Sequence, residues 1–187
     1  MNEFSVVKLI DSDGWWPAAE HRPSPNQDER PPGLEICLLV VHAISLPPQK
    51  FGGPGIVDLF LNQLDPNAHP YFGEIGHLRV SAHFLIRRDG KFIQFVSCNR
   101  RAWHAGVSTW NGLERCNDFS IGIELEGCDE APFETEQYVS LNQLTESLRQ
   151  SFPIKAIVGH SEIAAGRKTD PGPCFDWSRV AYRELQH

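Results

Sequence analysis

The chain has 187 residues, which is enough for one hydrophobic core and short for two, so we predict a single domain over residues 1–187. Hydrophobic residues make up 41% of the chain and charged residues 22%, a composition that excludes wholesale disorder and a coiled coil. The net charge of -7 leaves no basic field for nucleic acid or anionic lipid, and no apolar stretch approaches the roughly 20 residues of a membrane span, so neither partner is expected.

The segment 1–33 differs from the rest of the chain by its prolines, which stand among polar residues from position 17 onward. This composition predicts an extended arm on the surface, ahead of a core over residues 34–187. Glu3, Asp11 and Asp13 interrupt the start of the arm, so we expect no secretory signal. The five cysteines form no Cys-x-x-Cys pair, which argues against a disulfide framework. These features predict reduced thiols in a cytoplasmic protein, which we expect to be a monomer.

The first half of the core is predicted to hold a strand, a helix and a hairpin. The continuous apolar run 36–42 indicates a strand buried on both faces. Apolar residues at helical spacing predict a helix over 53–64, and a long loop follows over 65–78. Two β-rich runs joined by an Asp-Gly turn predict an antiparallel hairpin over 79–97.

The second half alternates strands with helices. Alternating apolar residues predict a strand over 119–127, helical spacing predicts a helix over 134–150, and a further apolar run predicts a strand over 154–160. A short helix capped by Asp176 should bury Trp177, Val180, Ala181 and Leu185. The fold class is therefore α/β, with a mixed central β-sheet that includes an antiparallel hairpin and is flanked by helices.

Two of the predicted buried strands end in a histidine, His42 in one and His160 in the other. Strand ends present side chains to a rigid site at the edge of a sheet, so both histidines are candidate metal ligands. Asp170, across a loop rich in glycine and proline, is the third candidate. Two imidazoles and one carboxylate leave a fourth tetrahedral position open, which is typical of catalytic zinc. The alternatives are that the histidines are satisfied core residues and Asp170 begins a turn, or that Cys174 is a ligand.

An open zinc site needs a base for its water and a positive group for the oxyanion. Glu124 is the candidate base, because it projects from the middle of an apolar strand, where a carboxylate is costly without a partner or a function. Glu126 lies on the same face but is predicted to be an exposed strand end. Lys168, two residues before Asp170, is the candidate positive group, although a solvated loop lysine is the commoner case.

At this point the residues resemble a known family. The segments "LLVVH", "RVSAHFLIRRDG", "AWHAGVSTWNG", "SIGIELEG" and "GHSEIAAGRKTDPGPCFDW" are similar to the cytosolic 1,6-anhydro-N-acetylmuramoyl-L-alanine amidases, the AmpD family of cell-wall recycling. More distantly they resemble phage lysozyme-type amidases and peptidoglycan recognition proteins. The resemblance implies one zinc ion per chain held by His42, His160 and Asp170, Glu124 as general base and Lys168 as transition-state stabiliser. It implies hydrolysis of the amide between the lactyl group of anhydro-N-acetylmuramic acid and L-alanine, in a small anhydromuropeptide.

The implied substrate carries free carboxylates, and an acidic protein needs arginines to bind them. Arg79 and Arg115 match positions that the family would use for this purpose. Tyr71, Trp103 and His104 are candidate walls for sugar or peptide. Three further histidines could equally be structural: His69, His77 and His83.

Two residues depart from the expected pattern. Ala43 stands where we expect asparagine, and Cys174 where we expect serine, but neither change affects the candidate ligands or base. Two other functions remain open: an amidase that acts on polymeric murein, and a module that binds muropeptides without hydrolysing them. The pattern leaves open whether movement of loop 45–78 gates activity.

Overall fold

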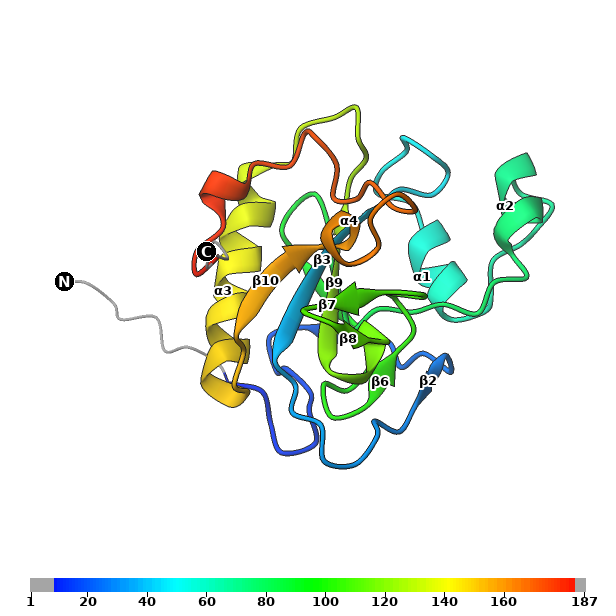
Figure 1. Ribbon diagram of the computed structural model, residues 1–187. Helices are drawn as coiled ribbons and strands as arrows, with labels where there is room; N and C mark the ends of the chain where they lie inside the picture. The colour runs from blue at the N-terminus through cyan, green and yellow to red at the C-terminus, as the bar shows by residue number, and fades with distance from the viewer. Residues whose placement is uncertain (1–8, 184–187) are drawn as a thin grey trace.

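The computed structural model describes residues 9–183, and its centre is a six-stranded sheet in the order β1-β5-β4-β9-β3-β10 (Figure 1). The strands are β1 (Glu20–His21), β5 (Phe92–Gln94), β4 (Phe84–Ile86), β9 (Ser120–Glu126), β3 (Leu38–Ile44) and β10 (Ala156–Gly159). The β4–β5 pair is antiparallel and the other pairs are parallel. The α/β class, the mixed sheet and the antiparallel hairpin are therefore confirmed.

Helices, 3-10 turns and two separate two-stranded ribbons accompany the central sheet. The helices are α1 (Gly55–Phe60), α2 (Pro70–Ile75), α3 (Thr135–Ser151) and α4 (His160–Ile163), with 3-10 turns η1 (Cys116–Asp118) and η2 (Trp177–Arg179). Two small ribbons pair β2 (Gln27–Asp28) with β6 (Arg101–Ala102) and β7 (Thr109–Trp110) with β8 (Leu113–Glu114). No helix within residues 9–183 is long and apolar enough to cross a bilayer.

Residue alternation divides the two central strands between the faces of the sheet. Leu39 and Val41 on β3 join Ile121 and Ile123 on β9 in the core cluster that contains the apolar face of α3. Figure 1 shows α3 lying along this side of the sheet. The alternate positions of β3, Leu38 and Val40, belong to a second cluster on the other face. Side chains at the alternate positions farther along the two strands, His42 on β3 and Glu124 on β9, therefore project away from α3.

Most of the predicted elements are present, and several are shorter than predicted. The helix expected over 53–64 is limited to α1, and the hairpin over 79–97 to β4 and β5. The loop predicted over 65–78 contains α2, whose six residues are too few to give a helical repeat. His69 caps this helix, since its Nδ1 accepts a hydrogen bond from the Tyr71 amide at 3.1 Å.

The C-terminal prediction is partly wrong. Asp176 does cap a turn, because its Oδ1 accepts a hydrogen bond from the Ser178 amide at 3.0 Å, but the turn is the single 3-10 turn η2. Val180 is buried there, whereas Trp177 and Ala181 are only partly buried. A turn this short has no continuous apolar face. Leu185 lies outside the described residues.

The described part of the N-terminal arm, residues 9–33, consists of turns and the two-residue strands β1 and β2, and it is not confined to the surface. β1 adds to the edge of the central sheet beside β5. Trp16 is fully buried in the core against Phe84 and Phe92, and the side chain of Gln94 accepts a hydrogen bond from its amide at 2.7 Å. Burying an indole of this size stabilises the fold by about 2–3 kcal/mol, so the arm contributes to the core.

Candidate metal centre

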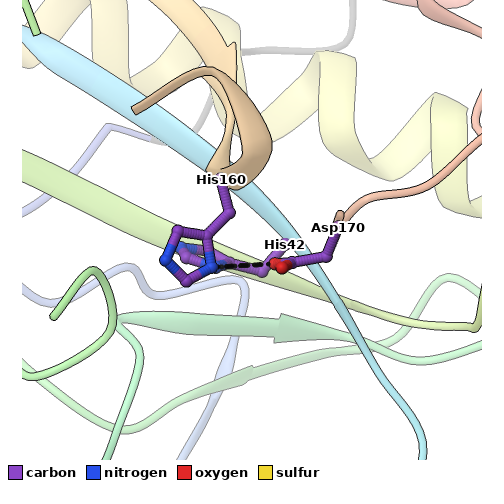
Figure 2. A group of neighbouring side chains, drawn as sticks. All are labelled: His42, His160 and Asp170. Carbon is purple, nitrogen blue, oxygen red and sulfur yellow. Dashed lines mark hydrogen bonds and ion pairs between the residues drawn. The ribbon is translucent and has the colours of Figure 1, made fainter. Parts of the chain in front are cut away.

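The two strand-end histidines meet because their strands are neighbours. β10 pairs with β3 in parallel, and Gly159 is in register with Val41, so the next residues along the two strands are His160 and His42. β3 continues to Ile44, so His42 is not its last residue, and His160 is the first residue of α4 and not the end of a strand. Figure 2 shows the two imidazoles approaching each other from these elements.

Backbone hydrogen bonds bring Asp170 back over the ends of these strands. The Ser161 amide donates to the Asp170 carbonyl at 2.9 Å, which ties the loop to the residue beside His160. The Gly172 amide donates to the Thr169 carbonyl at 3.0 Å in a turn where Gly172 has φ of +85°. A Cβ at Gly172 would lie 2.1 Å from a carboxylate oxygen of Asp129, so only glycine fits this turn.

The three candidate ligands converge on one point. His42 Nδ1 lies 3.0 Å from His160 Nδ1, and Asp170 Oδ2 lies 3.1 Å from the first and 3.0 Å from the second. Ligands at the usual zinc distances of about 2.0–2.1 Å, in tetrahedral geometry, are separated by roughly 3.3 Å. His160 Nε2 contacts the Ala105 carbonyl at 3.1 Å and can only donate to it, so a neutral His160 presents an unprotonated Nδ1 to the site. These side chains fit a metal ion, and Cys174 is not part of the group.

The site favours the protonation states that bind a metal. Burial lowers the pKa of His42 to about 4, which keeps its imidazole neutral at neutral pH. Burial alone would raise the pKa of Asp170, but contacts with His160 and His42 outweigh this effect and lower it. A neutral imidazole beside an ionised carboxylate is the combination that metal ligation requires.

Glu124 faces the same point from the neighbouring strand. It is in register with His42 across the parallel β3–β9 pair, on the side of the sheet away from α3. Its Oε2 is buried and accepts no hydrogen bond from any of residues 9–183. Burial is the main cause that raises the pKa of Glu124 well above its ordinary value, and repulsion from Asp170 adds to it. A buried carboxylate oxygen without a partner is costly in a folded protein, which is a common property of catalytic acids and bases.

The prediction for Glu126 is wrong, because this residue is buried and paired. Its side chain is 2% exposed and lies 3.0 Å from Arg87 Nη1. The Gly52 amide also donates to it at 2.7 Å. β9 continues through Glu126 beside Ile44 of β3, so the strand end is covered by neighbouring segments and not by solvent.

A cavity of about 610 Å³ connects the candidate ligands with other predicted residues. Its walls include Glu124, the exposed Lys168, and three residues predicted to contact substrate: Tyr71, Trp103 and His104. Asp129 and Thr169 also line it, and the Thr169 hydroxyl lies 3.1 Å from Asp129 Oδ2. Thr169 stands in the loop that the sequence singled out, whereas nothing in the sequence distinguished Asp129.

The two predicted arginines are not among the residues that line this cavity. Arg79 is exposed and donates to three carbonyls of its own loop, those of Gly76, His77 and Leu78. Arg115 is exposed and pairs with Asp118 at 3.3 Å. Their role in binding substrate stays a prediction. A larger hollow of about 1170 Å³, lined in part by Arg87 and Glu126, contains none of the candidate ligands.

His83 is structural, since it is fully buried, accepts from the Gly122 amide at 3.0 Å and lies 3.1 Å from the Arg100 carbonyl.

A family model described as N-acetylmuramoyl-L-alanine amidase matches residues 33–173, which span every candidate ligand and the candidate base. The chain belongs to this amidase family. The amidase is 57% identical to the 1,6-anhydro-N-acetylmuramyl-L-alanine amidase AmpD of Enterobacter cloacae over 173 residues, which cover 91% of this chain and 92% of that protein.

Solved structures of similar proteins have the same fold. A crystal structure of a selenomethionine AmpD derivative superposes on the amidase with a TM-score of 0.89 at 57% identity, covering 91% of this chain and 96% of that one. The amidase AmiD from Escherichia coli, solved with anhydro-N-acetylmuramic acid-L-Ala-D-gamma-Glu-L-Lys, superposes with a TM-score of 0.59 at 28% identity, covering 93% of this chain and 65% of that one.

Proposed function

We propose that this amidase hydrolyses the amide bond between the lactyl group of 1,6-anhydro-N-acetylmuramic acid and L-alanine in small, soluble muropeptides. The observation that carries the proposal is the convergence of ligand atoms of His42, His160 and Asp170 within 4.8 Å of one another, beside the Oε2 of Glu124, which has no hydrogen-bond partner among residues 9–183. High identity over nearly the whole chain to AmpD supports the choice of substrate.

Zinc is the proposed metal, with one ion per chain. Two imidazole nitrogens and one carboxylate oxygen are ligands that zinc accepts, and three protein ligands leave a fourth position for water or substrate. When bound there, zinc polarises a carbonyl and lowers the pKa of a coordinated water. The ligand atoms would be His42 Nδ1, His160 Nδ1 and Asp170 Oδ2, the atoms that already face one another.

Glu124 is the proposed general base. Its Oε2 has no other hydrogen-bond partner among the described residues, so it is free to accept the proton of the attacking water. The raised pKa of Glu124 favours return of this proton to the leaving amine of L-alanine. Its position in register with His42 keeps the base on the same face of the sheet as the ligands.

Lys168 is proposed to stabilise the oxyanion, because it lines the cavity from the loop that carries Asp170. Tyr71 and Trp103 are proposed walls for the sugar or the peptide, and Arg79 and Arg115 are proposed to bind substrate carboxylates. Neither arginine lines the cavity. Binding of the substrate carboxylates by Arg79 or Arg115 therefore requires either a movement of their loops or a stem peptide that extends beyond the cavity.

Two features support a small substrate in the cytoplasm. A cavity of about 610 Å³ lies in the range of small-molecule sites. All five cysteines are free, as predicted, and free thiols are typical of a reducing compartment. We propose a monomer as the working form.

The test compares two substrates with one enzyme preparation. Purified enzyme with zinc should release the stem peptide from a soluble anhydromuropeptide, followed by chromatography and mass spectrometry, and should release little from intact sacculi. Rapid release from sacculi alone would replace this proposal with a polymeric-murein amidase. Binding of muropeptide without turnover, in a folded protein purified without zinc, would favour a non-catalytic binding module.

A further inference from the structure

His104 lines the cavity, yet both of its ring nitrogens are engaged by the protein. Nδ1 lies 2.9 Å from His42 Nε2, and Nε2 lies 3.2 Å from the Ser120 hydroxyl. We propose that His104 and Ser120 are positioning residues, which form a hydrogen-bonded chain that sets the tautomer of His42 and so aims its Nδ1 at the metal. This inference rests on the proposed zinc centre.

A backbone carbonyl fixes the direction in which the hydrogen bonds of this chain are donated. Ser120 Oγ lies 2.5 Å from the Cys116 carbonyl, and a carbonyl can only accept, so the single hydroxyl proton of Ser120 is donated to it. The hydroxyl oxygen then has only lone pairs to offer to His104. Its contact with His104 is therefore an N–H donation from Nε2.

The position of the proton on His104 determines the position of the proton on His42. In a neutral imidazole with the proton on Nε2, Nδ1 is an acceptor, so His104 Nδ1 can only accept the proton of His42 Nε2. With its proton on Nε2, His42 presents a lone pair at Nδ1 to His160 and Asp170. The chain thus runs from the ligand to a backbone carbonyl, and every member has one defined proton.

The fold holds the His104 ring in this place. A Cβ at Gly122 would lie 2.4 Å from His104 Cγ, so the ring packs directly on the β9 backbone where only glycine leaves room. The His104 amide donates to Asn117 Oδ1 at 3.1 Å. The His42 and His104 rings meet edge to face, with centroids 5.0 Å apart. Ser120 is fully buried, so water does not compete for its hydroxyl.

The same arrangement occurs on the second histidine ligand in a simpler form. His160 Nε2 donates directly to the Ala105 carbonyl, one residue after His104. Each of the two histidine ligands is therefore oriented by a hydrogen bond from its Nε2. Hydrogen-bond partners of metal-binding histidines typically contribute 10–100-fold to metal affinity. We expect an effect of this size from His104.

Nitrogen NMR on the wild-type zinc form tests the proton positions without any substitution. The ¹⁵N shifts should place a proton on Nε2 of both His42 and His104, with an unprotonated Nδ1 on His104. A proton on Nδ1 of His104 would reverse the chain and overturn the proposal. This measurement does not depend on whether a variant folds.

Zinc affinity, measured by competition with a chelator, tests the consequence. His104→Leu removes the acceptor and Ser120→Ala leaves His104 Nε2–H unpaired, so the dissociation constant should rise about 10–100-fold in the first and less in the second. His104→Asn places an amide oxygen near the former Nδ1 and should restore much of the affinity. The matched control is Ser140→Ala, which loses a buried hydroxyl bonded to the Gly90 carbonyl at 2.7 Å and should leave zinc affinity unchanged.

The outcomes separate this inference from the proposed metal centre. Equal zinc affinity in His104→Leu, His104→Asn and wild type would overturn the positioning role alone. Unchanged zinc affinity in Asp170→Ala would instead refute the metal centre on which the inference rests.

Discussion

Replacing Glu124 with glutamine tests the proposed general base most sharply, because one change should lower activity and raise stability. Loss of a general base costs about 10²–10⁴-fold in rate, which corresponds to roughly 3–5 kcal/mol in the barrier. Zinc content should not change, since Glu124 is not a proposed ligand. Turnover close to wild type in a zinc-loaded Glu124→Gln protein would refute the assignment.

The stability gain follows from the environment of the carboxylate. Glu124 Oε2 is buried without a hydrogen-bond partner among residues 9–183. A buried polar group left unsatisfied costs about 1–3 kcal/mol, and more when it is charged. Part of this cost disappears with the neutral amide of Glu124→Gln, so the metal-free variant should melt a few degrees above wild type at neutral pH, at about 2–4 °C per kcal/mol for a domain of this size.

The pH dependence of this gain has a defined sign. In the metal-free protein, burial and the charge of Asp170 raise the pKa of Glu124 well above its ordinary value of 4.5. The unfolded chain then loses this proton at lower pH than the folded chain, so wild type loses stability relative to Glu124→Gln as the pH rises above about 4.5. The difference in unfolding free energy should grow by at most about 1.4 kcal/mol per pH unit and then level off. A difference that is constant from pH 4 to pH 8 would show that the carboxylate is well solvated.

Glu126→Gln is the matched control, because both carboxylates project from the same face of β9. Glu126 pairs with Arg87 at 3.0 Å and accepts from the Gly52 amide, so its replacement should destabilise the protein by about 1.5–3 kcal/mol. Its activity per folded molecule should remain, since it is not a wall of the metal cavity. The two substitutions should therefore shift stability in opposite directions, as measured by chemical denaturation.

Three further predictions concern the metal and the oxyanion. Asp170→Ala should lose zinc, measured by metal analysis, while Cys174→Ser should retain it. The reverse result would make Cys174 the third ligand in place of Asp170. Lys168→Ala should keep zinc and lower kcat by about 10²–10³-fold, and a change in KM alone would assign Lys168 to substrate binding. Chelation should lower Tm by about 5–10 °C if free zinc had been 100-fold above its dissociation constant, and added zinc should restore it. An unchanged Tm would mean that the folded protein binds the metal weakly.

Local sequence patterns predicted most of the main elements and pointed to the three side chains that the structure brings together as candidate metal ligands, but they left open that the two histidines are satisfied core residues. The apolar run that ends at His42, the alternation around Glu124 and the Asp-Gly turn each reflect the side-chain period or turn chemistry of a few residues. These patterns depend only on neighbours along the chain. Short elements such as α2 were missed because six residues carry too little of the helical period.

Contacts between residues distant in the chain determined the hydrogen-bond partners that local sequence patterns left open. Glu124 and Glu126 occupy equivalent places in the alternation, yet Glu124 has an oxygen without a hydrogen-bond partner in the described part of the chain, whereas Glu126 is paired with Arg87. Likewise, His104 gave no sign that both its nitrogens would be engaged, because its partners lie 62 and 16 residues away along the chain.

The sequence by itself determined which side chains are available for the chemistry and which face of each strand they occupy, because these depend on local periodicity. Only the tertiary structure decided that β3, β9 and β10 are adjacent and in a register that brings His42 beside Glu124 and His160. Sheet register is set by the packing of segments that are distant in the chain, so no local pattern specifies it. The same packing decides which of these carboxylates keeps an oxygen without a hydrogen-bond partner among residues 9–183, and it sets the contacts from which the proton positions of the histidine chain are proposed.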